Sequence, residues 1–93
     1  MQKWTQDEAI AFECACEAIT HLQAILTGQI DEERRKGCPD TERIESLRAE
    51  RLRLSQERAN LHVKDHENVA RVRAEYGARV RAWRAEYATS QLM

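Results

Sequence analysis

A single strong helix breaker, the segment Gly37-Cys38-Pro39, divides this 93-residue chain into two long stretches. Glycine favours the end of a helix, and proline stops a helix because it has no amide hydrogen to donate. The whole chain holds three glycines and one proline, too few for the many turns of a β-sandwich or barrel. Alanine, glutamate, arginine and leucine dominate the rest, which is typical of long helices. The sequence therefore predicts an all-α protein.

The first stretch carries the signals of a helix over about residues 5–36. Thr5 and Glu8 are spaced as a capping box, in which each side chain accepts a hydrogen bond from the other residue's backbone amide. Mostly apolar residues then recur every three or four positions in two neighbouring stripes, a face wider than one partner helix covers. The stripes are Phe12, Ala15, Ile19, Leu22 and Leu26, and Ala11, Cys14, Ala18, His21 and Ile25. We expect Gly37 to end this helix in the left-handed conformation, within a turn over residues 37–40.

The second stretch predicts a longer helix over about residues 40–88, with a frayed C-terminus over residues 89–93. Leucines keep heptad spacing in its first half, and two near-copies separated by eleven residues follow, Val72–Tyr76 and Trp83–Tyr87. The polar segment 62–68 between these patterns holds neither glycine nor proline, so we favour one uninterrupted helix. The alternative is a break in that segment, which would give a three-helix bundle.

These two helices predict a long antiparallel hairpin, coiled-coil-like and forming a single domain over residues 1–93, with arms of unequal length. At 1.5 Å per residue, the arms span roughly 48 and roughly 73 Å. Folding the chain at residue 38 places Thr5 near residue 71. A stripe in the second helix would then project beyond the first helix: Val72, Tyr76, Val80, Trp83 and Tyr87. We therefore predict a homodimer that buries this stripe in a helical bundle, with two-fold symmetry as the default.

An amphipathic helical object of this kind is typical of proteins that act by binding other proteins. We expect a small cytoplasmic adaptor, regulator or inhibitor that docks a protein partner through an apolar helical face. The residues that we assign to partner binding or dimerisation are Tyr76, Val80, Trp83, Tyr87, Phe12 and Ile19.

The end of the chain is basic and suggests an alternative function. Residues 69–93 hold five arginines and two glutamates, a net charge of +3, whereas the whole chain carries −1. The arginines are Arg71, Arg73, Arg79, Arg81 and Arg84. Together with the aromatic residues between them, they could contact phosphates and stack on bases, as a nucleic-acid-associated regulator would. The stretch contains no recognisable DNA-binding motif, and the acidic start of the first helix would neutralise part of it, so we favour a protein partner.

A metal site would draw on the histidines. His62 and His66 are four residues apart, one turn of a helix, and the hairpin register would place Cys14 opposite them. Cys14 and Cys16, however, point to different sides of a helix and cannot share one ion. The sequence also lacks a Cys-x-x-Cys pair and a His-Glu-x-x-His motif. We therefore predict no metal and no other cofactor.

Other classes of protein are argued against by what the sequence lacks. No glycine-rich phosphate loop and no supported Ser/His/Asp set is present, so we predict that the chain is not an enzyme. No run of 18 apolar residues is present, which argues against a membrane-spanning helix. Acidic residues within the first twenty positions argue against a signal peptide, so we expect a cytoplasmic chain with reduced cysteines.

Overall fold

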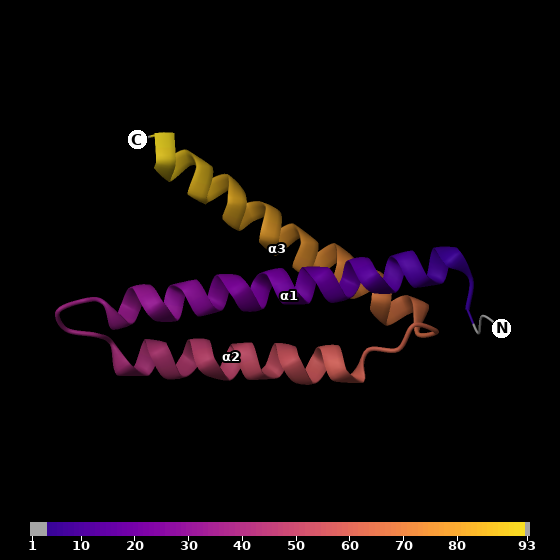
Figure 1. The fold of residues 1–93 in the computed structure, drawn as a ribbon, viewed down its shortest axis with the longest axis horizontal. Helices are drawn as coiled ribbons and strands as arrows, with labels where there is room; N and C mark the ends of the chain where they lie inside the picture. Colours follow the sequence, from indigo (N-terminus) through magenta and orange to yellow (C-terminus); the bar gives the residue numbers. More distant parts are fainter. Residues whose placement is uncertain (1–3, 93) are drawn as a thin grey trace.

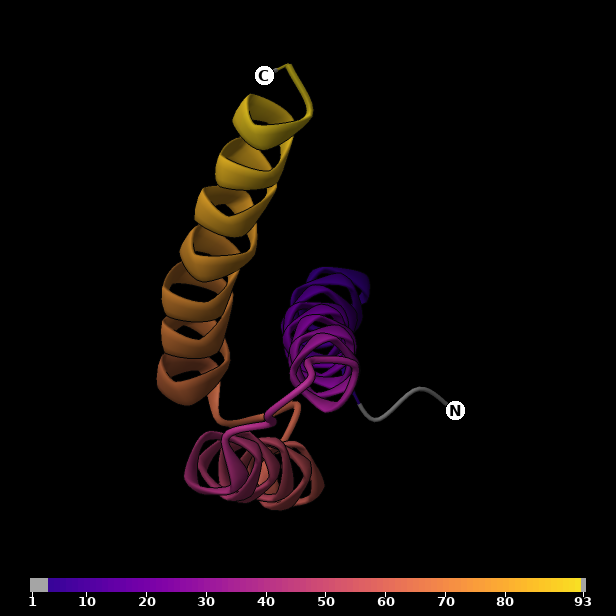
Figure 2. The ribbon, with the colours of Figure 1, turned by 90° about the vertical axis from the view of Figure 1, so that its left-hand side faces the viewer.

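The computed structural model describes residues 4–92 and shows an all-α fold, as the composition predicts. Three helices follow one another in this part of the chain: α1 (Gln6–Arg34), α2 (Thr41–Asn60) and α3 (His66–Leu92). α1 and α2 form an antiparallel hairpin. α3 packs on α1 and runs in the same direction as α1, and its C-terminal end diverges from the hairpin (Figures 1 and 2). The described chain measures 55 × 30 × 20 Å along its principal axes.

The start of α1 is the predicted capping box. The Thr5 hydroxyl accepts a hydrogen bond from the Glu8 amide at 3.1 Å, and the Glu8 carboxylate accepts one from the Thr5 amide at 2.8 Å. The end of α1 differs from the prediction, because Gly37 does not adopt a positive φ. The helix instead closes on its own last carbonyls, with the Arg35 amide donating to Asp31 at 3.2 Å. This closure needs no left-handed residue.

The connection between α1 and α2 is organised around Glu33, a carboxylate buried at the end of α1. Glu33 accepts hydrogen bonds from the Lys36 ammonium at 2.8 Å and from the Asp40 amide at 3.0 Å. These hydrogen bonds lower the pKa of Glu33 below its ordinary value. Asp40 then caps α2 by accepting from the Arg43 amide at 3.2 Å. The turn is therefore fixed at both ends by carboxylates.

The prediction of one uninterrupted helix over residues 40–88 is wrong. α2 ends at Asn60, and Leu61 turns to an extended conformation with ψ of 130° that buries its side chain in the core. Asp65 then accepts a hydrogen bond from the Asn68 amide at 3.2 Å, which caps the start of α3. Burial of one leucine and formation of a new cap thus break the chain without glycine or proline. The alternative of three helices is the one that the structure supports.

The second correction concerns the projecting stripe. Because α3 folds back onto α1, Val72, Tyr76 and Val80 are buried within the same chain rather than left beyond the first helix. The buried apolar residues come from all three helices and the second turn: Ala15, Ala18, Ile19, Leu22, Leu26, Ile30, Leu47, Leu54, Leu61, Val69, Val72, Tyr76 and Val80. α3 also remains helical as far as Leu92, where we expected fraying, and Met93 lies outside the described residues.

α1 is the shared packing partner of the other two helices. It supplies nearly half of the core residues, and both α2 and α3 pack against it. The backbones of α2 and α3, by contrast, have no pair of Cα atoms within 8 Å in the described helices. The wide apolar face of α1 is explained by this arrangement, since the helix must cover two neighbours at once.

α1 is more apolar than the sequence analysis expected of a helix in this chain. By length and composition it could cross a membrane, because one 18-residue window in it has a mean hydropathy of 1.3. A central helix with apolar residues on two sides has the same composition without any membrane. The membrane prediction and the cytoplasmic location stay untested.

Candidate functional site

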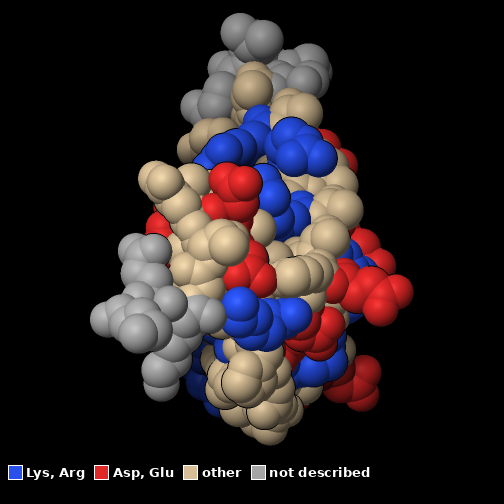
Figure 3. All heavy atoms as spheres, turned by 90° about the vertical axis from the view of Figure 1, so that its right-hand side faces the viewer, with Lys and Arg blue, Asp and Glu red and all other residues tan. Residues whose placement is uncertain are grey.

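The arginines of α3 divide into two that are paired and three that are not. Arg71 binds Glu57 at 2.6 Å, which raises the pKa of its guanidinium, and Arg79 binds Glu50 at 2.5 Å. Within the part of the chain that the structure describes, Arg73, Arg81 and Arg84 form no ion pair. On the face seen in Figure 3, basic and acidic side chains intermix and form no continuous basic surface.

The paired arginines connect α2 to α3, whose backbones do not touch. Glu57 of α2 accepts a hydrogen bond from the Tyr76 hydroxyl at 2.5 Å in addition to the one from Arg71. Partial burial opposes ionisation of Glu57, but the hydrogen bonds from Tyr76 and Arg71 outweigh it and lower the pKa. Arg79 lies over the Tyr76 ring at 5.7 Å, a cation–π contact. The contacts of Arg71, Tyr76 and Arg79 therefore stabilise the packing of the fold.

The sequence analysis missed this connection between α2 and α3. Glu75, one turn before Arg79 on the same helix, pairs with Arg71 at 3.0 Å, and Arg79 pairs with Glu50 of α2. No spacing in the sequence could reveal that Glu57 contacts Arg71 and that Glu50 contacts Arg79. In one uninterrupted helix, these glutamates would lie several turns away from the arginines. The break at residues 61–65 is what brings them together.

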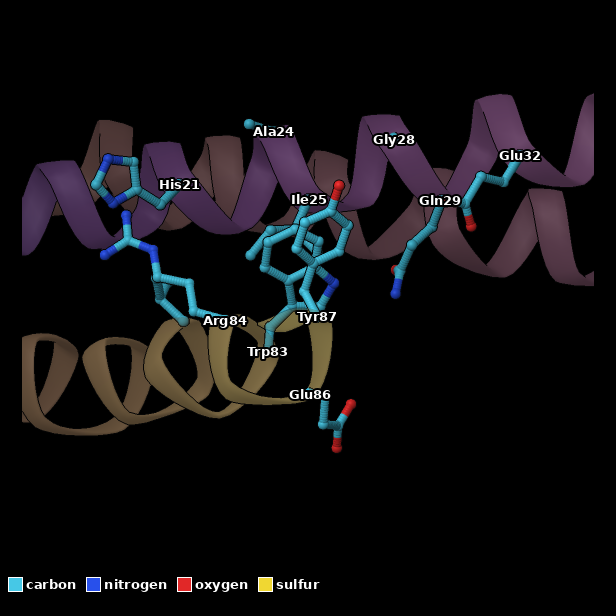
Figure 4. A pocket seen from close by; sticks show the side chains of 11 residues that line it. His21, Ala24, Ile25, Gly28, Gln29, Glu32, Trp83, Arg84, Glu86 and Tyr87 are labelled. Carbon is cyan, nitrogen blue, oxygen red and sulfur yellow. The ribbon is translucent and has the colours of Figure 1, made fainter. Parts of the chain in front are cut away.

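A groove lies between α1 and the C-terminal half of α3, where the two helices diverge (Figure 4). Its volume is about 500 Å³, within the range of protein binding sites. α1 contributes His21, Ala24, Ile25, Gly28, Gln29 and Glu32, and α3 contributes Val80, Trp83, Arg84, Glu86 and Tyr87. The residues of α1 at the groove include two small ones, Ala24 and Gly28.

The centre of the groove is aromatic. Trp83 and Tyr87 are four residues apart on α3 and stack with their ring centroids 5.2 Å apart and their planes at 16°. Trp83 is half-buried, whereas Tyr87 remains 54% exposed. Ile25 of α1 lies beside the two rings (Figure 4). This gives a preformed apolar surface in which two large side chains hold each other in place.

The structure separates the six residues that we assigned to partner binding. Trp83 and Tyr87 line the groove, and Phe12 lies half-buried along a different surface of α1. Ile19, Tyr76 and Val80 are buried within the chain. Their burial no longer requires a second chain, so the argument for a partner now depends on the two aromatic residues at the end of α3.

The histidines do not form the cluster on which a metal site would depend. His62 lies in the turn before α3 while His66 begins that helix, so the two do not share one helical face. His66 contacts the Glu8 carboxylate, and Lys64 binds the same group at 3.1 Å. Cys14 instead lines a groove with Gly77 and two arginines of α3. Among residues 4–92, no three His, Cys, Asp or Glu side chains come together as metal ligands would.

Glu8 gains an electrostatic role from these contacts. The Thr5 amide, His66 and Lys64 all favour the charged carboxylate, and together they lower the pKa of Glu8 from 4.5 to about 2. The capping box of α1 is thereby tied to the turn before α3.

Comparison with known proteins adds no relative. No protein family, no curated protein sequence and no solved structure matches this chain. The function must therefore be argued from the geometry described above.

Proposed function

We propose that this protein is a small helical interaction module, an adaptor, regulator or inhibitor, whose binding site is the groove between α1 and α3. The observation that carries the proposal is the Trp83–Tyr87 stack, which lies at the groove with Tyr87 more than half exposed. Aromatic side chains of this kind dominate the energetics of protein interfaces, because they bury a large area at little cost in entropy.

The shape of the groove favours a helical ligand. Because α1 and α3 diverge, the apolar side of a third helix can pack between them and contact both. Ile25, Trp83 and Tyr87 would contact the anchoring side chains of that ligand. The polar residues at the two ends, Arg84 and Glu32, would surround this contact.

A photo-crosslinking experiment tests this proposal. A benzoylphenylalanine in place of Tyr87 is expected to form one defined protein adduct in the native cell extract, whereas the same group in place of Leu52 forms none. Leu52 is a matched control because it is also apolar and 60% exposed, but lies on α2 away from the groove. Equal adducts at the two positions would contradict the proposal.

The captured protein is then purified and titrated against the full chain. Trp83→Ala is expected to weaken binding by at least about tenfold, as removal of an aromatic anchor does. A Trp4→Phe background leaves Trp83 as the sole tryptophan, so its fluorescence reports occupancy of the groove. Unchanged affinity in the Trp83→Ala variant would show that the ligand binds elsewhere.

A second candidate function is nucleic-acid association through α3. The observation that favours it is the set of three exposed arginines without carboxylate partners in the described chain, Arg73, Arg81 and Arg84. Retention on heparin at moderate salt that is lost in the Arg73→Gln/Arg81→Gln variant would support it. Elution at low salt, with no difference between the variant and the original chain, would exclude it.

A further inference from the structure

The groove between α1 and α3 has two ends of opposite charge. Arg84 lies at one end beside His21, whereas Glu32 and Glu86 lie toward the other end (Figure 4). The apolar residues described above lie between them. Along α1, the step from His21 to Glu32 covers eleven residues, or roughly 16 Å at 1.5 Å per residue. The groove is thus a polarised surface about three helical turns long.

These end charges are not satisfied within the described residues. Arg84 and Glu32 are both exposed, and neither forms an ion pair in residues 4–92. Two other arginines of α3 are paired with carboxylates of α2, Arg71 with Glu57 and Arg79 with Glu50. Within the described residues, the groove therefore offers a ligand one arginine without an ion pair at one end and two such carboxylates, Glu32 and Glu86, toward the other end.

We propose that a second copy of this chain occupies the groove in an antiparallel, two-fold arrangement, an inference that rests on the proposed function of the groove. A two-fold axis that lies in the interface and crosses the length of the groove at a right angle brings the basic end of one copy against the acidic end of the other. Arg84 then faces the partner's Glu32 twice per dimer, and the two Trp83–Tyr87 stacks meet at the axis. Each copy supplies the helix that the other copy lacks beside α3.

The charge pattern selects this orientation over its alternatives. A parallel arrangement would place like charges opposite each other at both ends, which is unfavourable in an interface that excludes water. A ligand of uniform charge would match one end of the groove and be repelled by the other. A second copy of the same surface, turned by 180°, matches both ends.

A pair of charge reversals tests the orientation directly. Arg84→Glu alone, or Glu32→Arg alone, makes both crossing contacts of the homodimer repulsive, and each should weaken dimerisation on the order of 10- to 100-fold. Mixing the two variants in equal amounts makes both contacts attractive again. We therefore expect sedimentation to show weakened self-association for each variant and a restored heterodimer in the mixture.

The controls separate orientation from net charge and folding. Arg73→Glu changes the net charge by the same amount, eleven residues earlier on α3 and outside this groove, and should leave dimerisation unchanged. Recovery in the mixture itself shows that both variants are folded. A mixture no more dimeric than its components would overturn the antiparallel arrangement.

The outcome also distinguishes this inference from the proposed function. If the original chain sediments as a 10.8 kDa monomer at all concentrations while a group at position 87 captures another protein, the second copy is wrong and the interaction module stands. If the chain is monomeric and position 87 captures nothing, both proposals fail. Crosslinking of position 87 to a second copy of the chain supports both.

Discussion

At the scale of single residues, carboxylates hold separate parts of this chain together. Glu8 links the start of α1 to the turn before α3, and Glu33 fixes the connection between α1 and α2. Glu57 links α2 to α3 through Arg71 and Tyr76. Each of these groups has a lowered pKa because its neighbours favour the charged form. The stability of the fold should therefore depend on specific carboxylates and on pH.

The Glu57 contact provides a test of the link between α2 and α3. Replacement Glu57→Gln weakens the hydrogen bonds to Arg71 and Tyr76, and we expect a loss of about 1–3 kcal/mol in the free energy of unfolding. Urea denaturation of Glu57→Gln, Tyr76→Phe and the double variant gives the coupling between the two side chains, expected at about 1 kcal/mol.

Glu45 serves as the control for this cycle. It is exposed, and among residues 4–92 its one ion pair is with Arg48 at 4.0 Å, so Glu45→Gln should change the free energy of unfolding by no more than about 0.5 kcal/mol. Additive effects of Glu57→Gln and Tyr76→Phe would mean that α2 and α3 are not joined by this hydrogen bond.

The lowered pKa of Glu8 predicts a dependence of stability on acid. A carboxylate with a lowered folded-state pKa stabilises the fold fully above its unfolded value, here 4.5, and this contribution is lost as the pH falls toward about 2. Thermal unfolding should therefore show a lower Tm for Glu8→Gln than for the original chain above pH 4.5. The two curves should converge near pH 2, and curves that stay parallel throughout would contradict the assignment.

At the scale of elements, the decisive feature is the end of α2 and the start of α3. Asp65→Ala removes the side chain that caps α3, and we expect a loss of about 1 kcal/mol in the free energy of unfolding. In an uninterrupted helix the same change would be neutral or stabilising, because alanine favours a helix interior more than aspartate does. Denaturation of this single variant thus decides between the two arrangements.

Asp40 provides a matched comparison for that measurement. It caps α2 through the Arg43 amide in the same way, so Asp40→Ala should be destabilising by a similar amount. A stabilising effect of Asp65→Ala beside a destabilising effect of Asp40→Ala would restore the continuous helix.

Local signals predicted the elements better than their connections. The capping box at Thr5 and the stop at Pro39 are short-range patterns, and the structure has both. The break after Asn60 depends on Leu61 finding a place in the core, which is a tertiary contact with no signature in the neighbouring residues. Asp65, three residues before Asn68, is a local signal for the N-cap of α3. Without glycine or proline nearby, this signal alone does not distinguish a helix start from a position inside a continuous helix. The aromatic spacing predicts that Trp83 and Tyr87 pack against another surface, but the groove beside them depends on the packing of α3 on α1, which no local pattern encodes.

At the scale of the whole molecule, stability should depend on α1 because both other helices pack against it. Ile19→Ala removes a fully buried side chain from the centre of α1, and we expect a loss of about 2–5 kcal/mol. Ile10→Ala, on the same helix but 50% exposed, should change the free energy of unfolding by about 0.5 kcal/mol or less. Chemical denaturation compares the two, and equal effects would mean that α1 is not the core of the fold.

The central position of α1 has a consequence for how the protein is made. α1 leaves the ribosome before α2 and α3, and the end of α3 follows 58 positions after the end of α1. At about 5–20 residues per second, that interval lasts roughly 3–12 seconds. During this time the nascent chain carries an apolar helix that α2 covers early and that α3 covers only after its own synthesis. Chaperones that shield apolar surface should therefore raise the fraction of the product that reaches the native state.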